Sequence, residues 1–382
     1  MQLQKMINRE RLAQTFIRLC ETDSPSRKEG QMAALVTEML GDLGAEPPFE
    51  DDSATETGSE CGNLIFRFVG DPNLEPLFFN CHLDTVEPCT GIKVVRKDDI
   101  FTSLGETILG SDDKSGIAAM IETLTVLQEK KLSHAPLEFL FTTCEEIGLL
   151  GAKAFKPEQL QARMGYALDS TGFGRVIIGA PACNRLRITI KGVAAHAGLH
   201  PEQGINAITL AGKALAMAPC GRIDEETTAN FGTLQGGAAS NIVAEEVVIE
   251  GEVRSHSPEK LDQLTAEIKQ AFSLVIEEWN DPVGEARGLP ELNFQVDEDF
   301  PVMQLAPEDA VIQRLDVAAA RVGIPMQHEV AGGGSDANIF NGRGLPTAII
   351  ATGMTHVHST AEQVSLEDMT NLTALLLALV GS

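Results

Sequence analysis

The segment LFFNCHLDTVEP at residues 77–88 decides the fold. Its first six residues are mostly apolar rather than alternating, which is typical of a strand that is buried on both faces of a sheet. His82 and Asp84 come at the end of this expected strand. In open α/β sheets, ligands bind outside the carboxyl ends of the strands. The segment therefore predicts a buried strand with a candidate site at its end.

Similar apolar runs recur along the chain, with helical patterns between them. The expected strands are Leu64–Val69, Leu77–His82, Leu137–Thr142, Tyr166–Leu168 and Thr347–Ala351. Apolar residues spaced three and four apart predict helices. The expected helices are two within residues 1–44, one over Ser115–Gln128 and one over Leu366–Val380. Strands that alternate with helices predict an α/β fold with a mainly parallel sheet.

The middle of the chain follows a different pattern. The order of its expected elements is strand, helix, strand, strand, helix, strand, which is the split arrangement of ferredoxin-like domains. These elements are Arg185–Lys191, Asn206–Met217, Thr228–Leu234, Val247–Arg254, Pro258–Trp279 and Glu291–Val296. We therefore predict one domain formed by residues 1–183 and 299–382. It is interrupted by an inserted α+β domain, residues 184–298.

Charge and composition exclude several classes of protein. The chain of 382 residues has 29 Lys and Arg against 55 Asp and Glu, a net charge of −26. Such a field repels nucleic acids and anionic membrane surfaces. We see no apolar stretch that would span a bilayer and no signal peptide. Seven cysteines without a CxxC pair indicate reduced thiols. We expect a cytoplasmic protein with no nucleic-acid or membrane partner.

Side chains that can bind metals follow several of the expected strands. They are His82, Asp84, Asp112, Asp113, Glu145, Glu146, Asp169, His356 and His358. Imidazole and carboxylate groups favour zinc, manganese or cobalt over a cysteine-rich structural zinc site. Their number suits two ions that share a bridging carboxylate. The residues alone do not choose between Asp112 and Asp113, Glu145 and Glu146, or His356 and His358.

Seven ordered motifs resemble those of the dizinc exopeptidase family that includes peptidase T, glutamate carboxypeptidase, aminoacylase and succinyl-diaminopimelate desuccinylase. They are HLDTV at 82–86, GSDDKSG at 110–116, TTCEEIGLLGA at 142–152, ALDSTG at 167–172, GVAAHAG at 192–198, GGGSDA at 332–337 and HSTAEQV at 358–364. The chain most resembles the peptidase T-like, tripeptidase-type branch. The resemblance implies an α/β dizinc catalytic domain with an inserted ferredoxin-like lid, and so covers essentially the whole chain.

The resemblance also implies two zinc ions per chain, with cobalt or manganese as substitutes. The implied ligands are His82 and Asp169 for one ion, Glu146 and His358 for the other, and Asp112 as the bridge. Glu145 would be the general base that takes the proton from the attacking water. Asp84 would orient His82 through its other ring nitrogen, as carboxylates often do for metal-binding histidines.

Further residues are implied to contact the substrate. On the lid, His196 would stabilise the oxyanion, although an exposed loop histidine without a role fits its sequence context too. Asn241 and Arg254 would hold a substrate carboxylate, which suits the planar fork of arginine. An ordinary surface ion pair is the alternative for Arg254. The glycine-rich run with Gly333, Gly334 and Ser335 would let the backbone approach the bound peptide.

The implied activity is hydrolysis of a terminal peptide bond of small peptides, by a peptidase T-like aminopeptidase or tripeptidase. An N-acyl amino acid deacylase or a carboxypeptidase of the same family is the alternative, because the metal motifs are shared. A non-catalytic peptide-binding protein is a distant alternative, since Glu145 and every expected ligand are present. Relatives that dimerise through the lid leave a homodimer open.

Overall fold

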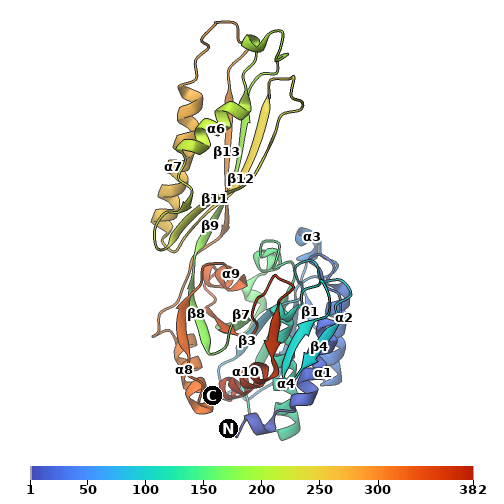
Figure 1. Ribbon diagram of the computed structural model, residues 1–382. Coiled ribbons are helices and arrows are strands. Elements are labelled where there is room, and N and C mark those ends of the chain that lie inside the picture. The colour runs from blue at the N-terminus through green and yellow to red at the C-terminus, as the bar shows by residue number, and fades with distance from the viewer. Residues whose placement is uncertain (1, 382) are drawn as a thin grey trace. The chain divides into compact units, whose positions relative to one another are not determined.

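The chain divides into two compact units. The computed structural model describes residues 2–381. Unit 1 comprises Met1–Gly179, Gln304–Ala331 and Ser335–Ser382, and unit 2 comprises Ala180–Met303 and Gly332–Gly334. Unit 1 thus combines the blue, cyan and red parts of the ribbon, so both ends of the chain build it (Figure 1). The domain boundaries at 184 and 298 stay a prediction from the sequence.

A nine-stranded sheet forms the centre of unit 1. Its order is β1-β2-β6-β3-β7-β16-β8-β14, with β15 paired to β8. The bounds are β1 Phe49–Glu50, β2 Leu64–Phe68, β3 Leu77–His82, β6 Leu137–Thr142, β7 Gly165–Ser170, β8 Arg175–Ala180, β14 Met303–Gln304, β15 Gln327–Val330 and β16 Thr347–Ala351. The central strands β6, β3, β7 and β16 run parallel to one another. The predicted α/β fold with a mainly parallel sheet is confirmed.

Helices cover both faces of this sheet. Their bounds are α1 Arg9–Cys20, α2 Gly30–Asp42, α3 Ala54–Thr57, α4 Ser111–Lys130, α5 Leu150–Ala154, α8 Ala310–Val322, α9 Asp336–Gly342 and α10 Leu366–Val380. The Cys81 side chain lies 3.5 Å from Met120 of α4. Thr142 of the neighbouring strand β6 is paired with His82, the residue after Cys81, so its side chain points to the opposite face from that of Cys81. There its hydroxyl donates a hydrogen bond to Asp336 of α9. Because successive strand residues point to opposite faces, α4 and α9 lie on opposite sides of the sheet.

Burial on both faces explains why the central strands are apolar. Every residue of β3 and of β6 is buried. Phe79 of β3 stacks on Tyr166 of β7 with ring centroids 5.8 Å apart. The Tyr166 hydroxyl donates to the backbone oxygen of Val311 at 2.7 Å, so its polar atom is satisfied. This rigid core holds the carboxyl ends of the strands in place.

A small antiparallel sheet lies beside the main one in unit 1. Its order is β17-β5-β4, over Gln363–Ser365, Ile100–Ser103 and Val94–Lys97. Strand β17 contains Gln363 and Val364, so this sheet anchors the end of the HSTAEQV motif. Among the described helices, none combines the length and the apolar character needed to cross a bilayer.

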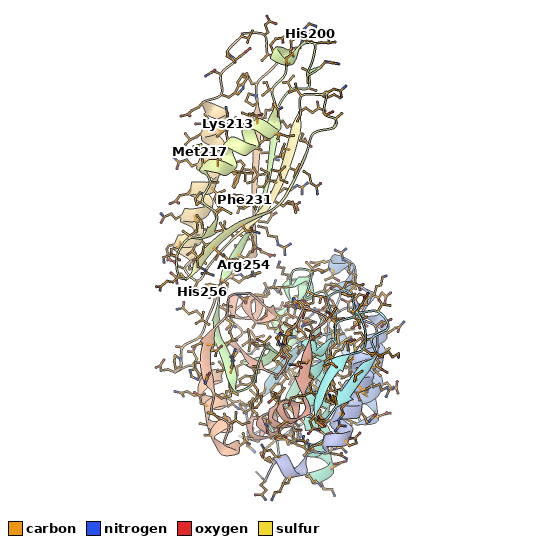
Figure 2. The ribbon with its side chains drawn as sticks, in the orientation of Figure 1. His200, Lys213, Met217, Phe231, Arg254 and His256 are labelled. Carbon is orange, nitrogen blue, oxygen red and sulfur yellow. The ribbon has the colours of Figure 1, made fainter. Side chains whose placement is uncertain are left out.

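Unit 2 is a five-stranded antiparallel sheet with two helices on one face. The sheet order is β10-β11-β12-β9-β13. The bounds are β9 Ala182–Lys191, α6 Ala207–Met217, β10 Gly221–Arg222, β11 Thr227–Gly236, β12 Glu246–Ser255, α7 Pro258–Glu277 and β13 Glu291–Phe300. Leu186, Ile188 and Ile190 of β9 are buried in the core formed with α6 and α7. Figure 2 shows Lys213 and Met217 on α6. The predicted element order is observed, with β10 added.

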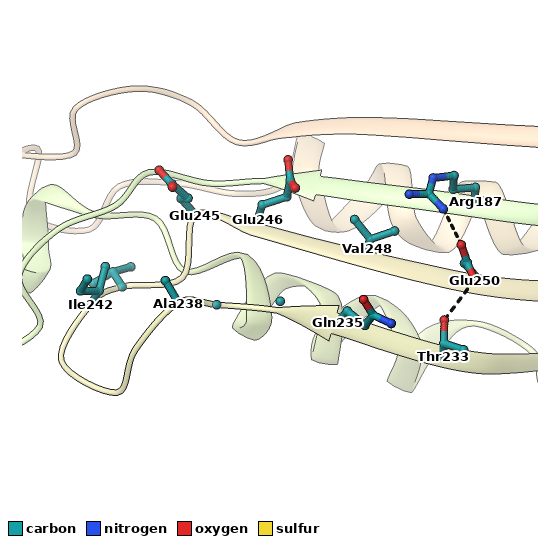
Figure 3. Close-up of a pocket in the computed structure, with 12 residues that line it drawn as sticks. Arg187, Thr233, Gln235, Ala238, Ile242, Glu245, Glu246, Val248 and Glu250 are labelled. Atoms are coloured by element: carbon teal, nitrogen blue, oxygen red, sulfur yellow. Dashed lines mark hydrogen bonds and ion pairs between the residues drawn. The ribbon is translucent and has the colours of Figure 1, made fainter.

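The other face of this sheet is polar. Arg187 pairs with Glu250, and the Thr233 hydroxyl lies 3.5 Å from the Glu250 carboxylate (Figure 3). A hollow of about 370 Å³ on this face is lined by these residues and by further glutamates such as Glu245 and Glu246. Alternation of apolar and polar residues along β9 therefore separates a core face from a polar face.

Candidate metal centre

Three side chains near the carboxyl ends of the central strands form a cluster that can hold a metal ion. They are His82 at the end of β3, Asp112 in the first turn of α4, and Glu146 after β6. One ligand atom from each lies within 4.8 Å of the other two. His82 Nε2 is 3.0 Å from Asp112 Oδ1. The topology therefore brings together side chains that are 64 residues apart in sequence, counted from 82 to 146.

His358 joins this cluster from the C-terminal part of the chain. Its Nε2 is 3.3 Å from Asp112 Oδ2 and 3.1 Å from Glu146 Oε2. The two oxygens of Asp112 therefore face two different imidazoles, as a carboxylate shared by two ions would. His356 makes a different contact, in which its backbone oxygen accepts a hydrogen bond from the Ser359 hydroxyl at 2.6 Å.

Asp84 is fully buried beside the cluster. Its backbone oxygen lies 2.8 Å from His82 Nδ1, whereas its carboxylate oxygen Oδ1 is 3.6 Å from that nitrogen. The carboxylate accepts hydrogen bonds from the backbone N–H groups of Glu145 and Glu146 and from the Ser26 hydroxyl. The backbone of Asp84 therefore orients the histidine, and its side chain fixes the glutamate loop.

Glu145 and Asp169 interact electrostatically with the cluster. Burial raises the pKa of Glu145 well above its usual value, with His82 acting in the opposite direction. Asp169 lies in β7 at its carboxyl end, and burial together with the charge of Asp112 raises its pKa too. Glu145 follows Cys144, whose φ of 55° turns the chain sharply after the strand.

The electrostatics of the cluster fit a divalent cation. Burial opposes ionisation of Asp112, but hydrogen bonds from His358 and His82 hold the pKa of Asp112 below its usual value. Burial raises the pKa of Glu146. Within the described part of the chain, its buried Oε1 has no hydrogen-bond partner. A cation would satisfy that oxygen and offset the repulsion between buried carboxylates. Imidazole and carboxylate donors suit zinc, manganese or cobalt.

Three supporting residues escaped the sequence analysis. Ser26 and Glu29 lie between α1 and α2, and Glu362 lies in the HSTAEQV motif. Glu29 Oε1 accepts a hydrogen bond from the backbone N–H of Cys144 at 3.0 Å. A glutamate in a loop is ordinarily exposed, yet Glu29 and Glu362 are almost fully buried. The motif position of Glu362 was an available signal, whereas Ser26 and Glu29 lie outside the motifs, and the burial of all these side chains becomes visible only in the fold.

The substrate-contacting residues expected on the lid lie in unit 2. His196 is exposed and forms an isolated backbone bridge with Ile242, and the Asn241 backbone oxygen accepts a hydrogen bond from Ala197 N. Arg254 is half-buried on β12, where Nη2 donates to Glu252 at 3.0 Å (Figure 2). Their contacts with a substrate stay predictions.

The glycine-rich run ends at α9. Ser335 is the N-cap of α9, and its side chain accepts a hydrogen bond from Ala337 N. A Cβ atom on Gly334 would lie 2.4 Å from the Phe300 ring, so glycine permits this close approach. For Gly333 the corresponding Cβ would lie 3.9 Å from an Arg254 nitrogen, an ordinary contact. Contact of this run with a peptide stays a prediction.

Comparisons with known proteins agree with this geometry. Residues 78–382 match the model of peptidase family M20/M25/M40. The crystal structure of aminopeptidase PepT from Bacillus cereus is 40% identical and has a TM-score of 0.88, covering 98% of this chain and 99% of that one. A tripeptidase from Staphylococcus aureus is 33% identical with a TM-score of 0.91, covering 98% of both chains. Peptidase T of Haemophilus influenzae is 26% identical over 349 residues, which are 82% of this chain and 83% of that protein.

The family match covers most of the chain, and the matches to the two crystal structures each cover 98% of it. The metal-type cluster falls within the matched residues. The resemblance to the peptidase T-like branch is therefore confirmed. The chain belongs to peptidase family M20/M25/M40, in its peptidase T-like branch, and is a metallopeptidase.

Proposed function

We propose that this protein is a zinc-dependent aminopeptidase that removes the N-terminal residue of small peptides, with tripeptides as the preferred class. The observation that carries the proposal is the cluster of His82, Asp112, Glu146 and His358. It occurs in a chain that is 40% identical to an aminopeptidase PepT over 98% of its length. Zinc is the ion we expect, with cobalt or manganese as substitutes, because all three accept nitrogen and oxygen ligands.

The proposed metal ligands divide between two ions. They are His82 and Asp169 for one ion, Glu146 and His358 for the other, and Asp112 for both. When bound, divalent ions of this kind polarise the carbonyl that is attacked and make a water molecule more acidic.

Glu145 is the proposed general base. Its carboxylate takes the proton of the attacking water and later gives it to the amine that leaves. Burial raises its pKa, and a raised pKa makes the carboxylate a stronger base toward the proton of the water. Asp84 holds the backbone of Glu145, so the base keeps one position during both transfers.

The proposed substrate contacts lie in unit 2, except for Ser335 of unit 1. His196 would donate a hydrogen bond to the oxygen that becomes negatively charged, and Asn241 and Arg254 would bind the carboxylate of a short peptide. A guanidinium suits this task because it binds a carboxylate through two parallel hydrogen bonds. Gly333, Gly334 and Ser335 are the proposed backbone neighbours of the peptide.

The test compares a tripeptide that has a free amine with the same tripeptide acetylated at its N-terminus. We expect zinc-loaded protein to cleave the free tripeptide, release its first residue and lose this activity to a chelator. The Glu145→Gln variant should be inactive on the same peptide. Cleavage of the acetylated peptide would favour a deacylase or a carboxypeptidase, and the released product would separate these two. If wild-type protein binds zinc but cleaves neither peptide, the proposal fails.

A further inference from the structure

Glu362 is a buried carboxylate that contacts one loop through four hydrogen bonds. The residue is 1% exposed. Its Oε2 accepts hydrogen bonds from the backbone N–H groups of Leu109 and Gly110, both at 2.8 Å. Its Oε1 accepts from the Ser111 hydroxyl at 2.6 Å and from the Asp112 N–H at 3.1 Å. Four donors from consecutive residues therefore converge on a single side chain.

The loop needs such an acceptor because its backbone is not helical. Gly110 has a φ of 75°, and Asp112 has φ −83° and ψ 105°, although α4 formally begins at Ser111. The N–H groups at the start of a helix lack partners within the helix. An anionic acceptor is favoured there because these N–H groups and the helix dipole carry partial positive charge. Glu362 provides that acceptor and so fixes the conformation of residues 109–112.

Glu362 is itself held in a closed loop. Thr355 and Gln363 exchange backbone hydrogen bonds at 2.9 and 3.0 Å. Gln363 begins β17, which pairs with β5. His358 lies in the loop that these bonds close, and its Nε2 is 3.3 Å from Asp112 Oδ2. One loop therefore contacts Asp112 twice, through the imidazole of His358 and through the carboxylate of Glu362.

We infer that Glu362 is a positioning residue of the metal centre. It fixes the backbone of residues 109–112 against the loop that carries His358, so that the Asp112 carboxylate meets His82 and His358 in one arrangement. The inference rests on the proposed role of Asp112 as a metal ligand. Side chains that orient metal ligands typically change metal affinity by about 10–100-fold when they are replaced.

The test variant is Glu362→Gln, which keeps the size of the side chain. An amide has one acceptor oxygen, so its NH₂ group must face one of the two pairs of donors. The Ser111 hydroxyl can turn and accept a hydrogen bond, but the Asp112 N–H cannot. We expect the loop to lose its fixed conformation at Asp112.

Glu138→Gln is the matched control. Glu138 is 3% exposed and accepts hydrogen bonds from the backbone N–H groups of Gln161 and Ala162 at 2.7 and 2.8 Å, and its other oxygen pairs with Arg67 at 2.9 Å. It too is a buried carboxylate that binds backbone donors, but it lies near the amino end of β6 and does not contact residues 109–112. Its replacement loses bonds of this kind and also the ion pair with Arg67, so it reports a stability cost at least as large as theirs without the effect on the metal centre.

The measurement is zinc affinity by competition with a chromophoric chelator, alongside thermal unfolding, kcat and KM. We expect Glu362→Gln to bind zinc about 10–100-fold more weakly, with KM for the peptide unchanged and kcat partly restored by excess zinc. Glu138→Gln should bind zinc like the wild type although it loses at least as much thermal stability. Equal zinc affinity of Glu362→Gln and the wild type would overturn the inference.

A milder pair of variants serves if Glu362→Gln does not fold. Ser111→Ala removes one of the four hydrogen bonds, and Ser115→Ala removes a buried hydroxyl contact to Thr352, 2.9 Å long, from the same helix. Ser111→Ala should weaken zinc binding and Ser115→Ala should not, so equal affinities would refute the role of Glu362.

Asp112→Asn separates the two proposals. If this variant binds zinc as tightly as the wild type, the proposed metal centre is wrong. If it loses zinc while Glu362→Gln keeps it, the metal centre stands and only the positioning role is refuted.

Discussion

Oδ1 of Asp84 accepts a hydrogen bond from the backbone N–H of Glu145 at 2.9 Å. Asp84 follows the strand that ends at His82, and Glu145 follows the neighbouring strand. The same carboxylate also binds the backbone of Glu146 and the hydroxyl of Ser26. One side chain thus connects three parts of the site: the proposed general base Glu145, the proposed metal ligand Glu146 and the segment that contains Ser26.

Replacing Asp84 should therefore disturb the site while leaving most of the fold intact. In Asp84→Asn, an NH₂ group faces at least one backbone donor, so the loop with Glu145 and Glu146 loses a hydrogen bond. We expect kcat/KM for the tripeptide to fall by about 10–100-fold. Asp281→Asn is the control, because Asp281 binds the backbone of a unit 2 loop. If both variants keep wild-type kcat/KM, the positioning role of Asp84 is wrong.

The adjacent residues Glu145 and Glu146 should respond differently to the same change. Glu145→Gln removes the proposed base and should lower kcat by about 10²–10⁴-fold with zinc affinity nearly unchanged. Glu146→Gln removes a proposed ligand and should weaken zinc binding, so part of its lost activity should return at high zinc concentration. Zinc titration of activity and binding checks both. Similar zinc affinities for the two variants would contradict the assignment.

Zinc should stabilise unit 1, because it binds the folded cluster of buried carboxylates and imidazoles. At a free zinc concentration about 100 times Kd, binding adds about 2.7 kcal/mol to the free energy of unfolding. For a unit of this size we expect Tm to rise by about 5 °C or more relative to protein in chelator. Differential scanning calorimetry measures the shift. The increase in Tm should be smaller in Glu146→Gln. If zinc does not change the Tm of the wild-type protein, it does not bind at the cluster.

The sequence was sufficient to predict the apolar strands and to predict that candidate site residues follow the ends of these strands. The runs at Leu77–His82 and Leu137–Thr142 form strands with those bounds, because burial on both faces leaves a strong apolar signal. Val69 was expected in the preceding strand but lies outside it and is 96% exposed. Positions at the end of a strand carry no such signal, because a side chain that is exposed to solvent can be polar or apolar.

Other features depend on contacts that a sequence does not display. The short strands β4 and β5 lack a long apolar run, and α9 spans only Asp336–Gly342. Non-proline peptide bonds are almost always trans, so the cis bond between Asp112 and Asp113 has no sequence signal. The burial of Glu362 depends on a contact with residues 109–112, about 250 positions earlier in the chain. The family motifs identified the neighbourhood, but only the fold pairs these segments.

Two glycines within helices should show opposite effects when they are replaced by alanine. Gly212 lies in α6, and an added Cβ would meet nothing within 4 Å. Gly212→Ala should stabilise unit 2 by about 0.5–1 kcal/mol, because alanine restricts the unfolded chain and favours the helix. Gly116 lies in α4, where an added Cβ would be 2.7 Å from Cys81 Sγ and 2.8 Å from Leu168 Cβ. The same gain in helix propensity is outweighed there by overpacking, and Gly116→Ala should destabilise unit 1 by about 1–3 kcal/mol. Urea unfolding of both variants measures the change in the free energy of unfolding. If Gly116→Ala is more stable than the wild type, α4 does not pack this closely on β3 and β7.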